Sequence, residues 1–503
     1  MFHFSKSKYC EFKQCPKACW LHQYKDEERE RDAAVDARME SGNNVGDLAM
    51  GLFGEYVEVT TLKPDGSLDY ERMKELTKQY VQEGREIICE AAFDHNGLYC
   101  AVDILRKREN GYAMYEVKSS TKPDKYVYLL DVCYQKYVLE KCGIHVDGVY
   151  IVTIDSGYVF DGTLDINKLF KITDVSALVV QEIGMVEGDL KRVEEILALH
   201  TEPNIDLSCS CVEPYPCAYW NYCTKALPKP SIFDLYRMKF STAIDHYRNG
   251  IISFEDILRG GVKLNDKTRR QIEFALEERG TYINKEGVKA FLDTLTYPLY
   301  FLDFETMQLA VPMYVGTRPY QQITFQYSLH YIDEKGGKLK HKEFLAESGP
   351  DPRRALAERL VQDIPENACV LAYNKAFECS RIQELAEAFP DLATHLLKIR
   401  DNIKDLLVPF QSGYYYNRDM GGSFSVKSVL PAIFPNDPSL NYHNLDEVHN
   451  GSEAMELFPK IKDMPQKERE AARLNLLEYC KLDTLAMVKI FEELLRATGE
   501  ETV

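Results

Sequence analysis

The sequence predicts an α/β protein with two α/β domains joined by a helical segment. A chain of 503 residues is too long for one ordinary hydrophobic core. Strand-like and helix-like segments occur on both sides of residues 224–231, a short polar stretch with two prolines that is typical of a linker. With 45% hydrophobic and 28% charged residues, the composition is that of a folded soluble protein. We expect domains over residues 1–228 and 295–503, with a helical linker region over residues 229–294.

The first domain is expected to hold a small mixed sheet flanked by helices. Apolar residues recur at helical spacing in the expected helices, and short apolar runs bounded by turn residues mark the strands. Gly143 follows one helix, as expected of a glycine just past a C-terminus. In chain order we expect helices over residues 5–22, 28–40 and 70–81, a strand over 87–93, two extended segments over 101–120, a helix over 129–142, a strand over 146–154 and a helix over 182–200.

The remaining chain begins with helices and continues as a second α/β region. Ser253 is followed by two acidic residues, which is typical of a helix start. The expected elements are helical segments over residues 233–291 including 266–278, a strand starting near Tyr297, strands over 324–332 and 369–373, and terminal helices over 468–495.

The charge and the cysteine content limit the function classes. A formal net charge of −18 argues against attraction of nucleic acid over the whole surface, because phosphate affinity comes mainly from lysine and arginine. Nucleic acid must therefore bind locally. No apolar run has signal-peptide or membrane-spanning length, so we expect a cytoplasmic protein without a membrane partner. In that reducing compartment, fourteen cysteines are hard to explain as disulfides.

Two groups of cysteines stand apart from the scattered ones, which lie in apolar contexts where buried free thiols are common. Thiolates at compact spacing suit an iron–sulfur cluster or tetrahedral zinc, and buried thiols without metal are the alternative. The groups are Cys10, Cys15 and Cys19, and Cys209, Cys211, Cys217 and Cys223.

A carboxylate and lysine pair marks the stretch 101–120. Side chains alternate along a strand, so Glu116 and Lys118 share one face, and Asp103 on the neighbouring strand could meet both. Two carboxylates with an adjacent ammonium can hold a divalent cation and orient a water for attack on a phosphodiester. The alternative is a solvated strand pair with a surface salt bridge.

Asp103, Glu116-Val117-Lys118 and a following helix with Gln135 resemble the PD-(D/E)xK nuclease superfamily. The resemblance implies that Asp103 and Glu116 bind Mg²⁺ or Mn²⁺, and that Lys118 and Gln135 are catalytic as well. Leu139 stands where the family's glutamine motif usually has a tyrosine.

The family's usual helical metal-ligand histidine is missing, because Gly46 stands near the matching position. Asp47 or Glu90 would then complete the metal site.

The cysteines extend this resemblance to residues 4–223. Cys15-Pro16 and the later Cys211, Cys217 and Cys223, each separated by five residues, resemble the RecB-like, CRISPR-associated iron–sulfur nucleases. In that group one early and three late cysteines hold a 4Fe-4S cluster, which the resemblance implies for these four. Cys209 could replace Cys211, and zinc is the alternative metal.

A second set of acidic residues lies in the last domain. Asp303 and Glu305 fall on the same side of one strand, where two carboxylates would repel unless a cation separated them. Glu378 follows a later apolar run. Tyr479 and Asp483 are four residues apart in a helical segment and thus share a face.

This three-part order resembles the DnaQ-like DEDD exonucleases, which have an RNase H fold, in the branch with a tyrosine before the last aspartate. The resemblance implies that Asp303, Glu305, Glu378 and Asp483 hold two metal ions and that Tyr479 orients the attacking water. Glu378 departs from the family, which normally has aspartate there. The three segments also resemble an uncharacterised bacterial domain that is often fused behind a RecB-like nuclease domain.

The sequence thus predicts a metal-dependent DNA nuclease that acts in repair, recombination or defence, and the DEDD resemblance implies an exonuclease. DNA with a single strand or an end is the expected substrate, and a helicase or another repair or defence protein is a possible partner. The alternatives are an RNA-directed nuclease and a nucleic-acid-binding scaffold with impaired catalysis.

Overall fold

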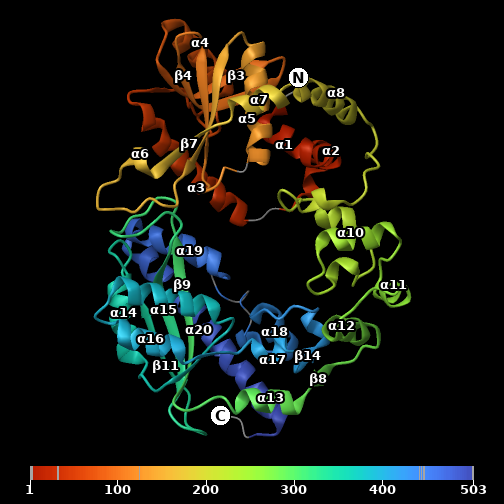
Figure 1. The fold of residues 1–503 in the computed structure, drawn as a ribbon, viewed down its shortest axis with the longest axis vertical. Helices are drawn as coiled ribbons and strands as arrows, with labels where there is room; N and C mark the ends of the chain where they lie inside the picture. Colours follow the sequence, from red (N-terminus) through yellow and green to blue (C-terminus); the bar gives the residue numbers. More distant parts are fainter. Residues whose placement is uncertain are drawn as a thin grey trace. The chain divides into compact units, whose positions relative to one another are not determined.

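The computed structural model describes residues 4–30, 33–123, 125–440, 442, 445 and 448–500, with the backbone alone for residues 33–41 and 125. The chain forms two compact units, Met1–Ala226 with Leu309–Gln321, and Leu227–Gln308 with Gln322–Val503. Each has a mixed sheet flanked by helices, which confirms the expected α/β class (Figure 1). Among the described residues, no helix is both long and apolar enough to cross a membrane.

This division into two units differs in two ways from the three contiguous regions that the sequence predicts. The segment expected as a separate helical linker groups with the second unit, and residues 309–321 group with the first.

The first unit is built on a seven-stranded sheet of order β2-β3-β4-β5-β6-β7, with β1 paired to β4. The pairs β5–β6, β2–β3 and β1–β4 are parallel, and the other pairs are antiparallel. The strands are β1 (Phe4–Ser5), β2 (Val57–Glu58), β3 (Ile87–His95), β4 (Leu98–Lys107), β5 (Tyr112–Lys118), β6 (Val146–Ile154) and β7 (Phe170–Asp174).

Helices cover both faces of this sheet (Figure 1). On one face, α1 and α5 pack with α7 and α8 over β3–β6, and on the other face α3 packs over a second apolar cluster. The helices are α1 (Lys6–Gln14), α2 (Pro16–Tyr24), α3 (Ala33–Met50), α4 (Tyr70–Glu83), α5 (Lys125–Lys141), α6 (Ile166–Leu169), α7 (Ser176–Glu182), α8 (Gly184–Leu197) and α9 (Trp220–Thr224).

The first described residues are anchored to the beginning of β4. Phe4 and Ser5 pair with Leu98 and Tyr99, and the Tyr134 hydroxyl of α5 donates to the Phe4 carbonyl at 2.6 Å. The Ser5 side chain then caps α1. This anchoring fixes the direction in which the first residues of α1 project.

Residues 309–321 lie in the chain between β9 (Leu299–Gln308) and β10 (Gln322–Ile332) of the second unit, yet they pack in the first. Ala310 is buried in the cluster under α3, and the amide of Phe160 donates to the Thr317 carbonyl at 3.0 Å. The hydroxyls of Ser119 and Tyr320 lie 2.7 Å apart. The segment therefore reaches the residue that directly follows Lys118.

The second unit is built on a five-stranded sheet of order β11-β10-β9-β12-β13. β9, β10 and β11 are antiparallel, whereas β9, β12 and β13 run parallel, so β9 is the central strand. A separate pair joins β8 to β14. The further strands are β8 (Thr281–Ile283), β11 (Lys340–Leu345), β12 (Cys369–Ala372), β13 (Ile403–Asp405) and β14 (Tyr415–Asn417).

Two apolar clusters lie on the two faces of this sheet. One contains residues of α14, α15 and α16, and the other contains residues of α13, α18 and the long α20. The helices are α10 (Phe240–Arg248), α11 (Phe254–Arg259), α12 (Asp266–Leu276), α13 (Lys285–Leu292), α14 (Arg353–Asp363), α15 (Ala376–Ala388), α16 (Ala393–Asp401), α17 (Val408–Gln411), α18 (Val426–Ile433), α19 (Gly451–Lys460) and α20 (Gln466–Thr498).

Several expected elements are confirmed. The strand predicted over 146–154 is β6, and the helix predicted over 70–81 is α4. The helix expected over 182–200 is α8. The helical stretch expected over 5–22 forms two helices, α1 and α2, with Cys15 between them. The helix expected over 28–40 lies partly outside the described residues.

Candidate functional site

The acidic residues predicted in the last domain meet at the central strand of the second unit. Asp303 and Glu305 are alternate residues of β9 and therefore share a side of the strand. Cys480 and Asp483 are three residues apart on α20, which packs against β9. One carboxylate oxygen from each of Asp303 and Glu305 and the Cys480 sulfur all lie within 4.8 Å of one another. These three atoms are of the types that can ligate a metal ion.

Glu378 lies near this group, because its charge contributes to the raised pKa of Asp303. It lies in the first turn of α15, directly after β12, the parallel neighbour of β9. The side chain is only 3% exposed, and its Oε2 atom has no hydrogen-bond partner among the described residues. A buried carboxylate oxygen without a donor is costly, so a ligand for it is physically favoured.

Cations compensate these carboxylates only from beyond ion-pair distance in the described chain, where Lys427 acts on Glu305 and Asp483 and Arg381 acts on Glu378. Burial and the nearby Asp483 and Glu305 raise the pKa of Asp303 well above its usual value. Burial raises the pKa of Glu378 to about 8 and that of Asp483 to about 6. Within the described part of the chain, no lysine or arginine forms an ion pair with any of the four.

Two tyrosines hold Asp483 in place. The Tyr442 hydroxyl donates to Asp483 Oδ1 at 2.6 Å, and hydrogen bonds from Tyr442 and Tyr479 partly offset the effect of burial on the pKa of Asp483. Tyr479 is 4% exposed. The predicted sharing of one helix face by Tyr479 and Asp483 is therefore confirmed, whereas Tyr442 could not be found from its loop sequence.

In the first unit, three carboxylates lie level with one another on neighbouring strands. The β3–β4 register places Glu90 opposite Asp103, and continuation of the β4–β5 register places Asp103 opposite Glu116. Glu90 has a φ of 55°, which is rare for a residue with a side chain, and neither Glu90 nor Asp103 is part of the regular ladder there. Asp103 Oδ2 accepts instead from the Val117 amide at 2.6 Å.

Glu116 is the centre of a charged network, and it is only 1% exposed. Its Oε1 accepts from both Lys6 and Lys118 at 2.7 Å, and its Oε2 accepts from the Gln135 amide at 2.6 Å. Asp131 of α5 accepts from Lys118 at 2.6 Å and from Gln135 at 2.9 Å. The structure thus brings together Glu116, Lys118 and Gln135, as predicted.

In this network the charges of two lysines, Lys6 and Lys118, balance those of Glu116 and Asp131. The acidic group of the second unit has no such ion pairs in the described chain. Burial would lower the pKa of Lys118, but Asp131 and Glu116 raise it overall. Burial and Glu116 raise the pKa of Asp103 to about 8. Burial also raises the pKa of Glu90 to about 7, against the effect of Lys6.

Sequence reasoning missed two members of the network. Asp131 lies four residues before Gln135 on the same helix face, so helical spacing could have indicated it. Lys6 lies 110 residues from Glu116, and the sequence holds no local signal for that contact. Of the two candidates for the remaining ligand, Asp47 is exposed, whereas Glu90 is half-buried beside Asp103.

The predicted cluster cysteines also meet. Cys15, Cys211, Cys217 and Cys223 line one small cavity, and Cys209 does not line it. Backbone contacts support the grouping, because the Gln14 side-chain amide donates to the carbonyls of residues 210 and 215 at 2.8 and 2.7 Å. The pKa of Cys217 is raised to about 11 by burial.

No three cysteine sulfurs in the described chain lie within 4.8 Å of one another. The cavity that the four cysteines line has a volume of about 20 Å³.

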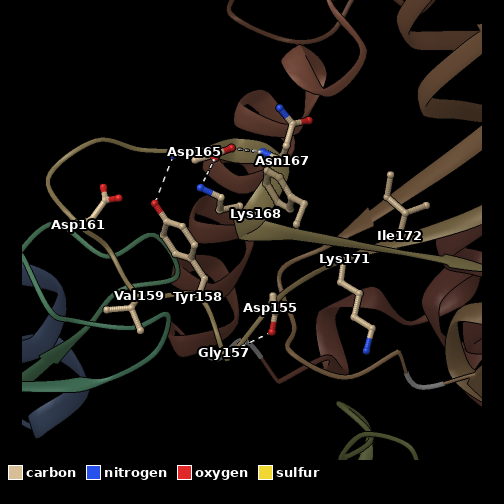
Figure 2. A pocket seen from close by; sticks show the side chains of 11 residues that line it. Asp155, Gly157, Tyr158, Val159, Asp161, Asp165, Asn167, Lys168, Lys171 and Ile172 are labelled. Carbon is tan, nitrogen blue, oxygen red and sulfur yellow. Dashed lines mark hydrogen bonds and ion pairs between the residues drawn. The ribbon is translucent and has the colours of Figure 1, made fainter.

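An open concavity of 710 Å³ lies elsewhere in the first unit, along residues 155–172 (Figure 2). Its polar groups satisfy one another. The Gly157 amide donates to Asp155 at 2.8 Å, and Lys168 pairs with Asp165 at 3.0 Å. None of the candidate residues lines this concavity.

A known protein family matches part of the second unit. Residues 300–425 match a family described as a domain of unknown function (DUF2779). That range holds Asp303, Glu305 and Glu378 but ends before Tyr479 and Asp483.

The chain is also similar to two uncharacterized proteins of bacteria. One, from Mycoplasma pneumoniae, is 28% identical over 210 residues, which covers 38% of this chain and 31% of the relative. The other, from Ureaplasma parvum, is 27% identical over 234 residues, which covers 41% of this chain and 32% of the relative. The chain therefore spans about a third of the length of these relatives.

Proposed function

We propose that this chain is a metal-dependent nuclease that hydrolyses phosphodiester bonds, with its main catalytic centre in the second unit. The observation that carries the proposal is that ligand oxygens of Asp303 and Glu305 lie within 4.8 Å of each other, while Asp483 and Glu378 lie near enough to raise the pKa of Asp303. None of the four is paired with a lysine or arginine in the described chain. Carboxylates so arranged repel unless divalent cations separate them.

These four carboxylates would hold Mg²⁺ or Mn²⁺. Two such ions supply charge stabilisation for the attacking and leaving oxygens of an in-line displacement. Tyr479, whose hydroxyl is held beside Asp483, would orient the attacking water. The strand order supports this assignment. On one side of β9 lie β10 and β11, each antiparallel to its neighbour, and on the other side lie the parallel strands β12 and β13, which is the arrangement of RNase H-like folds.

The first unit would provide a second hydrolytic centre of the PD-(D/E)xK kind. Asp103 and Glu116 would bind the metal, and Glu90 is the better candidate for the remaining ligand because it lies level with Asp103. Lys118 would stabilise charge that develops on the phosphate, and Gln135 would hold Glu116 in position.

The cysteine cavity supports a 4Fe-4S cluster on Cys15, Cys211, Cys217 and Cys223, with Cys211 favoured over Cys209 because only Cys211 lines the cavity. The cluster would tie the start of the unit to its end. All fourteen cysteines are free, which fits a cytoplasmic location.

DNA with a single strand or an exposed end is the substrate that we propose, in repair, recombination or defence together with a helicase or similar partner. An RNA substrate is the alternative that the same chemistry allows. A scaffold role has one observation in its favour, because Lys6, Lys118 and Gln135 together engage both oxygens of Glu116.

The test is a cleavage assay on single-stranded DNA, duplex DNA and RNA with Mg²⁺ or Mn²⁺. We compare Asp303→Asn, Asp103→Asn and the double variant with Asp351→Asn, an exposed aspartate of the second unit. Loss of cleavage in the double variant but not in the control supports the proposal. Metal-dependent cleavage that survives in the double variant would refute both catalytic centres, and tight binding without turnover would favour the scaffold.

A further inference from the structure

The side chain of Cys480 points into the acidic group of the second unit. Cys480 is fully buried, and its Sγ lies 3.8 Å from the backbone carbonyl oxygen of Asp303 and 3.9 Å from Asp303 Oδ2. Tyr479 precedes it and Asp483 follows three residues later on α20. The packing of α20 against β9 therefore turns the thiol toward the same space as the carboxylates.

The distances suit a shared ion. Metal–oxygen bonds of about 2.0–2.2 Å and metal–sulfur bonds of about 2.3 Å allow two ligands of one ion to lie at most roughly 4.5 Å apart. The ligand atoms of Asp303, Glu305 and Cys480 already lie within 4.8 Å of one another. Only a small adjustment of the side chains would let all three contact one ion.

A second observation points to a ligand in this space. The Oε2 atom of Glu378 is buried and has no hydrogen-bond partner in the part of the chain that the structure describes, and Glu378 lies close enough to raise the pKa of Asp303. Because the thiol is not alone, the site combines one sulfur with several oxygens. Such a mixed set is unusual for Mg²⁺, which prefers oxygen ligands alone.

We propose that Cys480 is a metal ligand that makes this site prefer Co²⁺ or Zn²⁺ over Mg²⁺. The inference rests on the proposed metal centre of the second unit and specifies its metal class. On binding, the sulfur–hydrogen bond breaks, a metal–sulfur bond forms and the proton passes to solvent. A thiolate is a softer donor than a carboxylate, so it adds affinity for these metals and little for Mg²⁺.

The competing explanation is structural. Cys480 could simply fill the core and donate a weak hydrogen bond to the Asp303 carbonyl. Serine keeps a donor of similar size but provides only oxygen, so Cys480→Ser separates the two explanations. Cys369, a buried cysteine of β12 in an apolar cluster, provides the matched control Cys369→Ser.

The experiment titrates the intact holoprotein with Co²⁺ and records the sulfur-to-cobalt charge-transfer absorption as a difference spectrum. We expect a band in the wild type and in Cys369→Ser that is lost in Cys480→Ser. Cobalt affinity should fall about tenfold in Cys480→Ser, while Mg²⁺ affinity, measured by competition, should change less than twofold. Cys480→Ala, checked by thermal unfolding, replaces the serine variant if that variant does not fold.

An unchanged band in both Cys480 variants would overturn the proposal, as would an equal loss of Co²⁺ and Mg²⁺ affinity. Binding is read by absorption, so its outcome is independent of cleavage. A protein that binds Co²⁺ through Cys480 but cleaves no nucleic acid would refute the proposed function and leave this inference standing. Asp303→Asn shows whether the absorption band belongs to this site. The substitution should weaken a band that arises from Cys480 and should not change absorption from cobalt bound to other cysteines.

Discussion

Glu378→Gln should stabilise the metal-free protein while it removes a proposed metal ligand. The pKa of Glu378 is raised by burial from 4.5 to about 8, so the folded state holds a proton that the unfolded state has lost at neutral pH. The carboxylate therefore lowers stability as the pH rises from about 4.5 to about 8. At pH 7 this difference corresponds to at most about 3 kcal/mol.

Glutamine carries no charge and can donate to the neighbouring carboxylates. We expect Glu378→Gln to raise the free energy of unfolding by about 1 to 3 kcal/mol at pH 7 in the presence of a chelator. The gain should vanish below about pH 4.5, where both states of the wild type are protonated. With Mn²⁺ present, the wild type should gain more stability than the variant, because the ion binds only the folded state.

Urea unfolding followed by circular dichroism is the measurement, over pH 4 to 9 in steps of about one unit. Both tryptophans, Trp20 and Trp220, lie in the first unit, so their fluorescence reports that unit separately and should not change. Glu387→Gln, an exposed position on the same helix, is the control. A gain that does not depend on pH, or a loss of stability at pH 7, would refute the reasoning.

Three further substitutions test the other assignments. Tyr479→Phe should lower the turnover of DNA by about 10- to 100-fold in single-turnover assays with Mn²⁺ while metal affinity stays the same, because the hydroxyl would orient the water; an equal loss of metal affinity would contradict that role. Lys118→Met should abolish the cleavage that remains in an Asp303→Asn background, and persistent cleavage there would remove the first centre. Cys211→Ser should lose iron and sulfide by elemental analysis, whereas Cys209→Ser should retain both; stoichiometric zinc in a colourless wild type would contradict the iron–sulfur assignment.

Local periodicity predicted the contacts within single elements. Alternation along a strand placed Glu116 and Lys118 on one face, and their side chains indeed meet at 2.7 Å. Helical spacing placed Tyr479 beside Asp483, and the same spacing could have revealed Asp131 beside Gln135. In each case the backbone geometry of one element fixes the distance, so the sequence alone is informative.

Contacts between distant elements could not be predicted in this way. Lys6 reaches Glu116 only because β1 pairs with β4 and so orients α1. Cys480 faces Asp303 because of how α20 packs on β9, and the loop residue Tyr442 reaches Asp483 from 41 positions away. These contacts depend on tertiary packing, for which a single sequence holds no periodic signal.

The placement of residues 309–321 bears on how the chain can be divided. This segment is encoded within the second unit but completes the first, where Ala310 fills an apolar cluster and Tyr320 meets Ser119. A single cut after residue 226 therefore cannot release two complete halves. Expression of the first half alone would need residues 309–321 supplied as a graft or a peptide, and gene rearrangements that exchange either half as a block would damage both.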